Sequence, residues 1–177
     1  MSAKRRLYFP KVMIHLGVVA LVALALQLLA IKAPLGDDLP RRVLIVVSYA
    51  LLLVFVAFNI RRPGLLVIGL GLCLNLLPIV VHGGLMPITP ETILRTGALP
   101  EGVSTGDWIP GSKDVLLARE DVHLWFLTDR FVWDDVSSVF RAFSLGDLVI
   151  VAGLVATIAD LFAPRLRQTS EQGTAPG

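Results

Sequence analysis

Four runs of apolar residues dominate this chain, and each is long enough to cross a membrane. The runs cover residues 12–31, 43–60, 65–81 and 145–163. A hydrocarbon layer about 30 Å thick requires roughly 17–25 predominantly apolar residues in a helix. The pattern therefore predicts an all-α integral membrane bundle of four transmembrane helices.

Polar and turn-forming residues separate the four runs. Pro63 and Gly64 predict a tight connection between the second and third runs, because proline and glycine interrupt a helix. Residues 82–144 form the longest separating segment, and we expect them to make an extracytoplasmic cap of short helices and loop. Residues 164–177 are polar and predict a disordered cytoplasmic tail. Residues 1–163 are thus expected to form a single membrane domain.

Local patterns predict elements within the cap. Thr89 followed by Pro90 is typical of a capped helix start. Residues 114–143 combine acidic residues with aromatic residues at helical spacing, which predicts one or two amphipathic helices on the membrane surface. Ser144 and Asp147 have the spacing of a capping box, so the last helix should begin there. The chain's three tryptophans fit a belt at the membrane interface: Trp108, Trp125 and Trp133.

The basic residues at the ends of the runs predict the orientation of the chain. Positively charged residues are enriched on the cytoplasmic side of membrane proteins. With both termini in the cytoplasm, the inner segments contain Lys4, Arg5, Arg6, Lys11, Arg61, Arg62, Arg165 and Arg167, and the short outer loop contains Lys32, Arg41 and Arg42. This distribution favours cytoplasmic N- and C-termini.

Composition supports a membrane protein and excludes several other classes. Apolar residues make up 55% of the chain and charged residues 17%, whereas soluble domains have about 45–50% and about 25%. The formal charge of +2 is too small to indicate nucleic-acid binding. Cys73 is the single cysteine, so the chain has no internal disulfide and no cysteine-based metal site, and its apolar surroundings predict a packed, inert thiol.

Polar residues inside or beside the third run are the candidates for a ligand site, because polar groups are costly in a membrane. Asn75 lies one helical turn before Pro78, and this proline predicts a bend or an unwound turn near Leu74. Asn75 can alternatively bond one helix to another. Asp129 in the cap and Asp147 at the start of the last run are polar groups expected at the same end of the bundle. The candidate ligand-binding residues are therefore Asn75, His82, Asp129 and Asp147. The candidate turn and capping residues are Pro78, Gly83, Gly84, Met86, Pro87, Ser144 and Gly146.

Metal binding and catalysis have little support in the sequence. Two histidines, His82 and His123, accompany acids in the cap, but their spacing matches no zinc motif. No nucleophile elbow or matched Ser/His/Asp set is present. We therefore assign no catalytic residue, no metal and no cofactor, and the sequence favours a role that is not enzymatic without deciding the question.

Several short motifs together resemble an uncharacterised family of small bacterial integral membrane proteins, a domain of unknown function. The motifs are Asn75, Gly83-Gly84-Leu85-Met86-Pro87, Leu127-Thr128-Asp129 and Ser144-Leu145-Gly146-Asp147. The resemblance extends to about Phe162, with His82 at a position where the family pattern has asparagine. It implies a bacterial cytoplasmic membrane location and brings no activity with it.

Two hypotheses for function follow. The first is a non-catalytic subunit or assembly factor of a membrane complex, with the lipid bilayer and another membrane protein, or a second copy of the chain, as partners. The alternative is an enzyme or carrier for lipids or isoprenoids whose site lies at the outer end of the bundle. The small size favours the first hypothesis, and the polar groups gathered near one end favour the second.

Overall fold

The computed structural model describes residues 17–35, 38–97, 101–132 and 142–172, with the backbone alone for residues 161–172. Several predicted features lie wholly or partly outside the described residues, among them residues 133–141 of the predicted amphipathic segment, which include Trp133. Others are residues 12–16 of the first run, the basic residues before it, and residues 173–177 of the tail.

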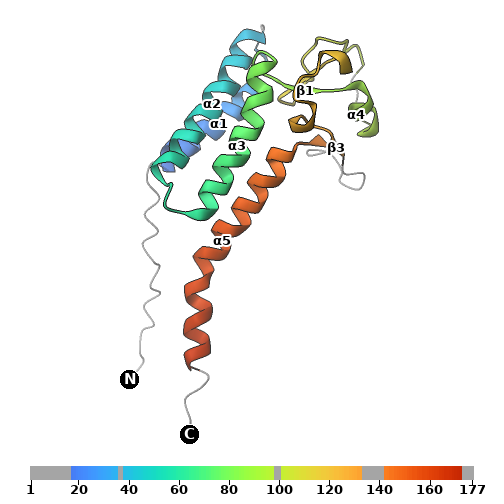
Figure 1. The fold of residues 1–177 in the computed structure, drawn as a ribbon. Coiled ribbons are helices and arrows are strands. Elements are labelled where there is room, and N and C mark those ends of the chain that lie inside the picture. Colours follow the sequence, from blue (N-terminus) through green and yellow to red (C-terminus); the bar gives the residue numbers. More distant parts are fainter. Residues whose placement is uncertain (1–16, 36–37, 98–100, 133–141, 173–177) are drawn as a thin grey trace.

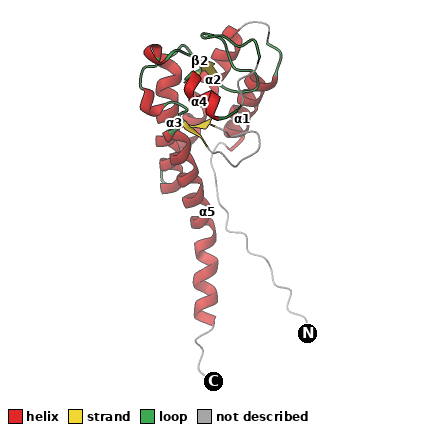
Figure 2. Cartoon of the chain, turned by 90° about the vertical axis from the view of Figure 1, so that its right-hand side faces the viewer, coloured by secondary structure: helices red, strands yellow, loops and turns green. Residues whose placement is uncertain are grey.

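Four long helices form a row in which each helix packs against the next of the four (Figure 1). They are α1 (Gly17–Lys32), α2 (Asp38–Phe58), α3 (Pro63–Val81) and α5 (Leu145–Gln172). The contact between α3 and α5 is the most extensive. α5 extends past the other helices at the end away from the cap (Figures 1 and 2). The described residues are therefore mostly helical, in agreement with the predicted helical class, but the cap also contains four short strands where an all-α fold was expected.

Two helices of the described residues, α2 and α3, are long and apolar enough to cross a membrane. The described part of α1 is apolar but shorter. Both α2 and α3 begin before the predicted apolar runs, at Asp38 and Pro63, because polar or proline residues are well tolerated in a first helical turn. The described residues thus contain two candidate spans, and the crossing of all four helices stays a prediction.

Two helix predictions about proline were wrong. α3 continues through Pro78 to Val81 without the unwound turn expected near Leu74. α5 continues through residue 164 to Gln172, where the sequence predicted an end at 163 and a disordered tail. A proline removes a single backbone donor, and the surrounding residues can keep the helix intact when they favour it.

The cap consists of short elements that pack at one end of α3 and α5 (Figure 1). These are β1 (Met86–Ile88), α4 (Pro90–Arg95), β2 (Asp114–Leu116), η1 (Arg119–Asp121), η2 (Trp125–Leu127), β3 (Phe131–Val132) and β4 (Ala142–Phe143). β1 pairs in parallel with β2, and β3 pairs antiparallel with β4. α4 begins as predicted, with Thr89 Oγ1 accepting from the Thr92 amide.

The amphipathic helices predicted over residues 114–143 are absent from the described part of that segment, which forms strands and 3-10 turns instead. The reason is that its backbone finds partners far away in the chain. The Leu117 amide, for example, donates to the carbonyl of Ile88. Such pairing overrides the local pattern in the described part of the segment. Most of the residues at helical spacing, 133–140, lie outside the described residues, so the prediction is untested there.

Glycines set the close contact between α3 and α5. A Cβ atom on Gly71 would lie 2.7 Å from the carbonyl oxygen of Gly146, and one on Gly153 would lie 2.8 Å from that of Gly64. Each helix therefore presents two glycines, seven residues apart, to the other. Small residues at such positions let helices approach closely where no hydrophobic force drives them together in lipid.

Cys73 lies on the outer surface of α3 and is exposed, so the prediction of a packed thiol was wrong. The interior of the protein is instead filled by larger apolar side chains. The core joins the row of helices to the cap: Ala30, Ile45, Tyr49, Val56, Leu72, Ile79, Leu85, Met86 and Val115.

Candidate functional site

A cluster of polar side chains joins the cap to α3 and α5. We call it the cap–helix cluster, and it consists of Asn75, Lys113, Asp129, Ser144 and Asp147. Asn75 and Ser144 have no exposed surface, and Asp129 is 3% exposed. Three of the four predicted ligand residues, Asn75, Asp129 and Asp147, thus lie together at one end of the row of helices.

Asn75 is held by the first turn of α5. Its Nδ2 donates to Asp147 Oδ1 at 2.7 Å, and its Oδ1 accepts from Ser144 Oγ at 2.6 Å. Ser144 and Asp147 also form the predicted capping box. The Asp147 amide donates to Ser144 Oγ and the Ser144 amide donates to Asp147 Oδ2, both at 3.0 Å. Two of the four side-chain bonds that start α5 therefore end on α3.

Lys113 supplies the positive charge of the cluster. Its Nζ lies 3.3 Å from Asp129 Oδ2 and 3.6 Å from Asp147 Oδ2, and its side chain is 21% exposed. Burial lowers the pKa of Lys113, but the negative charge of Asp129 and the groups around it outweighs burial and raises this pKa well above its usual value. Lys113 therefore stays an ammonium ion, which disfavours a role as an amine nucleophile.

Asp114 adds a further carboxyl group beside the cluster. It follows Lys113 in the chain, and its Oδ1 is buried without a hydrogen-bond partner among the residues that the structure describes. Burial raises the pKa of both Asp114 and Asp129, and the Lys113 ammonium only partly offsets the effect. A single ammonium does not neutralise Asp114, Asp129 and Asp147 together, so burial and the repulsion between carboxylates favour one proton held by the pair Asp114 and Asp129.

His82, the fourth predicted ligand residue, has a different set of partners. Its Nδ1 lies 2.7 Å from the carbonyl oxygen of Pro78, and its Nε2 accepts from the His123 amide at 3.0 Å. The two imidazole rings stack with their centroids 5.9 Å apart. Because Nε2 is an acceptor in this arrangement, Nδ1 is the nitrogen that donates to the carbonyl of Pro78. His82 therefore ties the end of α3 to the cap.

The predicted turn residues follow His82 and bring the chain from α3 into β1. The amide of Gly84 donates to the carbonyl of Ile79 at 2.7 Å and closes the end of α3. Gly83 and Gly84 have φ values of +71° and +105°, which favour glycine. Met86 and Pro87 then lie in β1, where both side chains are fully buried.

Sequence reasoning missed one member of the cluster, Lys113, and two groups beside it, Asp114 and Tyr49. Lys113 and Asp114 lie in a loop-rich segment with no motif around them. Tyr49 lies within an apolar run, and its hydroxyl is placed beside Asn75 and Lys113. Only the fold brings these residues to Asn75, since they are 26 or more positions away in the chain. The sequence offers one signal for Tyr49: a tyrosine inside an apolar run needs a polar partner for its hydroxyl.

The chemistry of the cluster is that of a bonded network. Each of its five side chains contacts at least one other through a hydrogen bond or ion pair. Among the described residues, no group of three or more His, Cys, Asp or Glu side chains is arranged to hold a metal ion. The geometry therefore favours a structural connection between the cap and the helices over a set of groups poised for reaction.

Comparison with known proteins identifies the family of the chain. The model of DUF5317, a family of unknown function, matches residues 11–159. No curated protein and no solved structure gives a significant match. The family match covers most of the chain, so the chain belongs to DUF5317, which confirms its predicted place in an uncharacterised family.

Proposed function

We propose that this member of DUF5317 is a non-catalytic subunit or assembly factor of a membrane complex. The observation that supports the proposal is the internal use of the cap–helix cluster. Its charged and amide groups bond to one another and fix the cap on α3 and α5. A rigid cap carried on membrane helices suits a protein that presents a surface to a partner.

The proposal includes a bacterial cytoplasmic membrane location with four spans and both termini in the cytoplasm. The length and apolar character of α2 and α3 support it, as do the apolar surfaces that α1 and α5 expose. The cap then lies outside the cytoplasm, and the lipid bilayer surrounds the row of helices. The whole chain up to residue 163 acts as one membrane domain.

The cap offers a surface for a partner. Trp125 is 58% exposed and Phe126 is 48% exposed, and Arg130 lies over the Trp125 ring. Aromatic residues and arginine are enriched where proteins bind one another. We propose that another membrane protein, or a second copy of the chain, docks on this surface or on the exposed faces of the helices.

Mass spectrometry of the protein, gently extracted from its native membrane, tests the proposal. We expect a companion polypeptide, or a second copy, in fixed stoichiometry. A protein that elutes as a monomer without any companion contradicts the proposal.

W125A then separates the two docking surfaces, with L94A as the control because Leu94 is similarly exposed on α4. Loss of the companion in W125A alone assigns docking to the cap, and retention in both assigns it to the helices.

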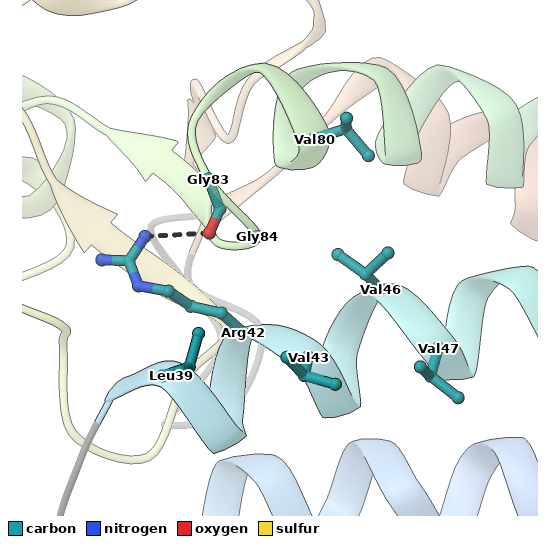
Figure 3. A pocket seen from close by; sticks show the side chains of 8 residues that line it. All are labelled: Leu39, Arg42, Val43, Val46, Val47, Val80, Gly83 and Gly84. Atoms are coloured by element: carbon teal, nitrogen blue, oxygen red, sulfur yellow. Dashed lines mark hydrogen bonds between the residues drawn. The ribbon is translucent and has the colours of Figure 1, made fainter.

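Lipid handling is the second candidate function, and a different observation favours it. The residues first considered for this role, Asn75, Asp129 and Asp147, are bonded to one another. An open apolar groove lies elsewhere, between α2 and α3 (Figure 3). A lipid or isoprenoid retained by the extracted protein in the absence of any protein companion would favour this candidate.

A further inference from the structure

An apolar groove lies between α2 and α3 near the Gly83-Gly84 turn, and Arg42 stands at its end (Figure 3). Its volume is about 290 Å³. Leu39, Arg42, Val43, Val46, Val47, Val80, Gly83 and Gly84 line it. Because Val43 and Val80 are more than half exposed, the groove opens along its length to the surroundings of the two helices.

The packing of α2 on α3 explains why the groove opens at this end. Farther along α3, Gly69 lets the two helices meet closely, since a Cβ atom there would lie 2.7 Å from Val56 Cγ1. Near the Gly83-Gly84 turn, valines face the gap from both helices, as Figure 3 shows for Val46 and Val80. The space between them is therefore walled by branched apolar side chains and closed at one end by backbone.

Arg42 is fixed at the closed end by neutral groups. Its Nη1 donates to the carbonyl oxygens of Gly83 at 3.1 Å and His82 at 3.4 Å. Its Nη2 lies 3.9 Å from Asp38 Oδ2, and the Asp38 side chain is 49% exposed. A half-exposed pair at this distance compensates the charge only weakly. The guanidinium is thus oriented by carbonyl groups and places a positive charge at the closed end of the groove.

We infer that this groove binds one anionic phospholipid, with an acyl chain against the valines and the phosphate on Arg42. The apolar walls match a hydrocarbon chain, and guanidinium groups bind phosphate oxygens through paired charge-assisted hydrogen bonds. Arg42 lies in the first helical turns of α2, where a membrane-spanning helix meets the headgroup layer. The inference goes beyond the subunit role and needs only that α2 and α3 lie in a bilayer.

Native mass spectrometry of the purified protein tests the inference. The protein is released from micelles containing either phosphatidylglycerol or phosphatidylcholine, which carry the same acyl chains. We expect one phosphatidylglycerol to be retained in preference to phosphatidylcholine. R42Q should lower the apparent affinity for phosphatidylglycerol roughly tenfold, the change that follows from losing one charge-assisted contact.

Matched variants make the result specific to the groove. R61Q removes an exposed arginine between α2 and α3 at the other end of the helices and should leave retention unchanged. V80W fills the groove from α3 and should displace both lipids. R42K keeps the charge without the paired geometry and should give an intermediate loss, so it replaces R42Q if that variant does not fold. Only variants whose unfolding temperature and elution volume equal those of the wild-type protein enter the comparison.

Equal effects of R42Q and R61Q, or unchanged lipid retention in V80W, would overturn the inference. Equal retention of the two lipids by the wild-type protein would overturn it as well, because the phosphate contact would then provide no selectivity. The subunit proposal is tested separately, by the presence or absence of companion polypeptides in native membrane extracts. A failure of one is therefore not mistaken for a failure of the other.

Discussion

Gly146 provides the space for the amide of Asn75. A Cβ atom at this position would lie 2.1 Å from Asn75 Oδ1. The Ser-x-Gly-Asp motif can thus be explained residue by residue. Ser144 donates to Asn75, Gly146 makes room for it, and Asp147 accepts from it.

G146A should therefore destabilise the protein although alanine is the better helix former. The gain in helix propensity is about 1 kcal/mol, and overpacking costs about 1–3 kcal/mol before the loss of the Asn75 hydrogen bonds is added. Thermal unfolding of the purified protein in detergent measures the sum. G17A is the control, because a Cβ atom on Gly17 meets nothing within 4 Å. A G146A protein as stable as G17A would contradict this account of the motif.

Lys113 holds the cap through its charge, and K113M should loosen the cap. The substitution leaves Asp129 buried beside Asp114 without its cation. Removing one partner of a buried pair costs about 3–5 kcal/mol, and the partial exposure of Lys113 places the expected loss near the lower limit. Limited proteolysis should then cut within the cap at lower protease concentration. R119M is the control, since its pair with Glu91 is exposed and should change stability by less than about 0.5 kcal/mol.

The raised pKa values of Asp114 and Asp129 predict that stability falls as pH rises. The unfolded chain loses these protons near the ordinary pKa of 3.8, whereas the folded protein keeps a proton on the pair to higher pH. Their contribution to stability is complete below the unfolded pKa and is lost as pH rises through the folded pKa. The slope is at most about 1.4 kcal/mol per pH unit for one proton.

Comparison of wild type with D114N isolates this effect. Asparagine at position 114 keeps a hydrogen-bonding group without an ionisable proton. As pH rises, the unfolding free energy of the wild-type protein should therefore fall more than that of D114N. Unfolding between about pH 4 and pH 8 covers the expected window. A difference that does not vary with pH would contradict the shared proton.

At the scale of elements, His82 connects the end of α3 to the cap turn at His123. H82F should keep the stacking of the two rings but remove the acceptor that the His123 amide uses. The amide of His123 should then exchange its hydrogen faster, while amides in the middle of α3 keep their protection. H123F is the control, because it leaves the backbone donor and the His82 ring in place. Equal exchange at position 123 in H82F and wild type would contradict this connection.

The long helices and their starts are the elements that the sequence predicts well. The long apolar runs predicted α2 and α3 to within five residues at each end, and Thr89 and Ser144 marked helix starts that the hydrogen bonds confirm. These features depend on local physics, namely hydrophobic length and capping. Asn75, Asp129 and Asp147, which the sequence analysis selected as ligand-binding candidates, do lie together in the structure, and their binding of a ligand stays a prediction.

The cap could not be predicted in the same way. The strand pairing of Met86 with Asp114 joins segments separated by a long loop, and no local spacing encodes it. The ion pairs of Lys113 with Asp129 and Asp147 depend on this pairing, because it places Asp114 and the neighbouring Lys113 beside the end of α3. Lys113 is one basic residue among several in the cap, and nothing in its neighbours marks it as the one that becomes buried.

For the whole molecule, the positions of Arg41 and Arg42 affect the orientation argument. They are the basic residues that fit least well with an outer location. Arg41 is buried, donates to the carbonyl of Ala30 and lies with its guanidinium carbon 3.4 Å from the centre of the Trp108 ring. Arg42 donates to the carbonyls of His82 and Gly83. Both arginines thus have a structural use inside the fold, which weakens them as signals for a cytoplasmic segment.

The orientation can be tested by labelling single cysteines in whole cells, in a C73S background. E101C lies in the cap and should react with a membrane-impermeant maleimide in intact cells. I60C lies at the turn between α2 and α3 and should react only after permeabilisation, although Ile60 is 57% exposed. The physical reason is that the bilayer separates the two ends of α3, a helix of 19 residues. The reverse labelling pattern would mean that the cap faces the cytoplasm, and reaction of both cysteines in intact cells would mean that α3 does not separate them across a membrane.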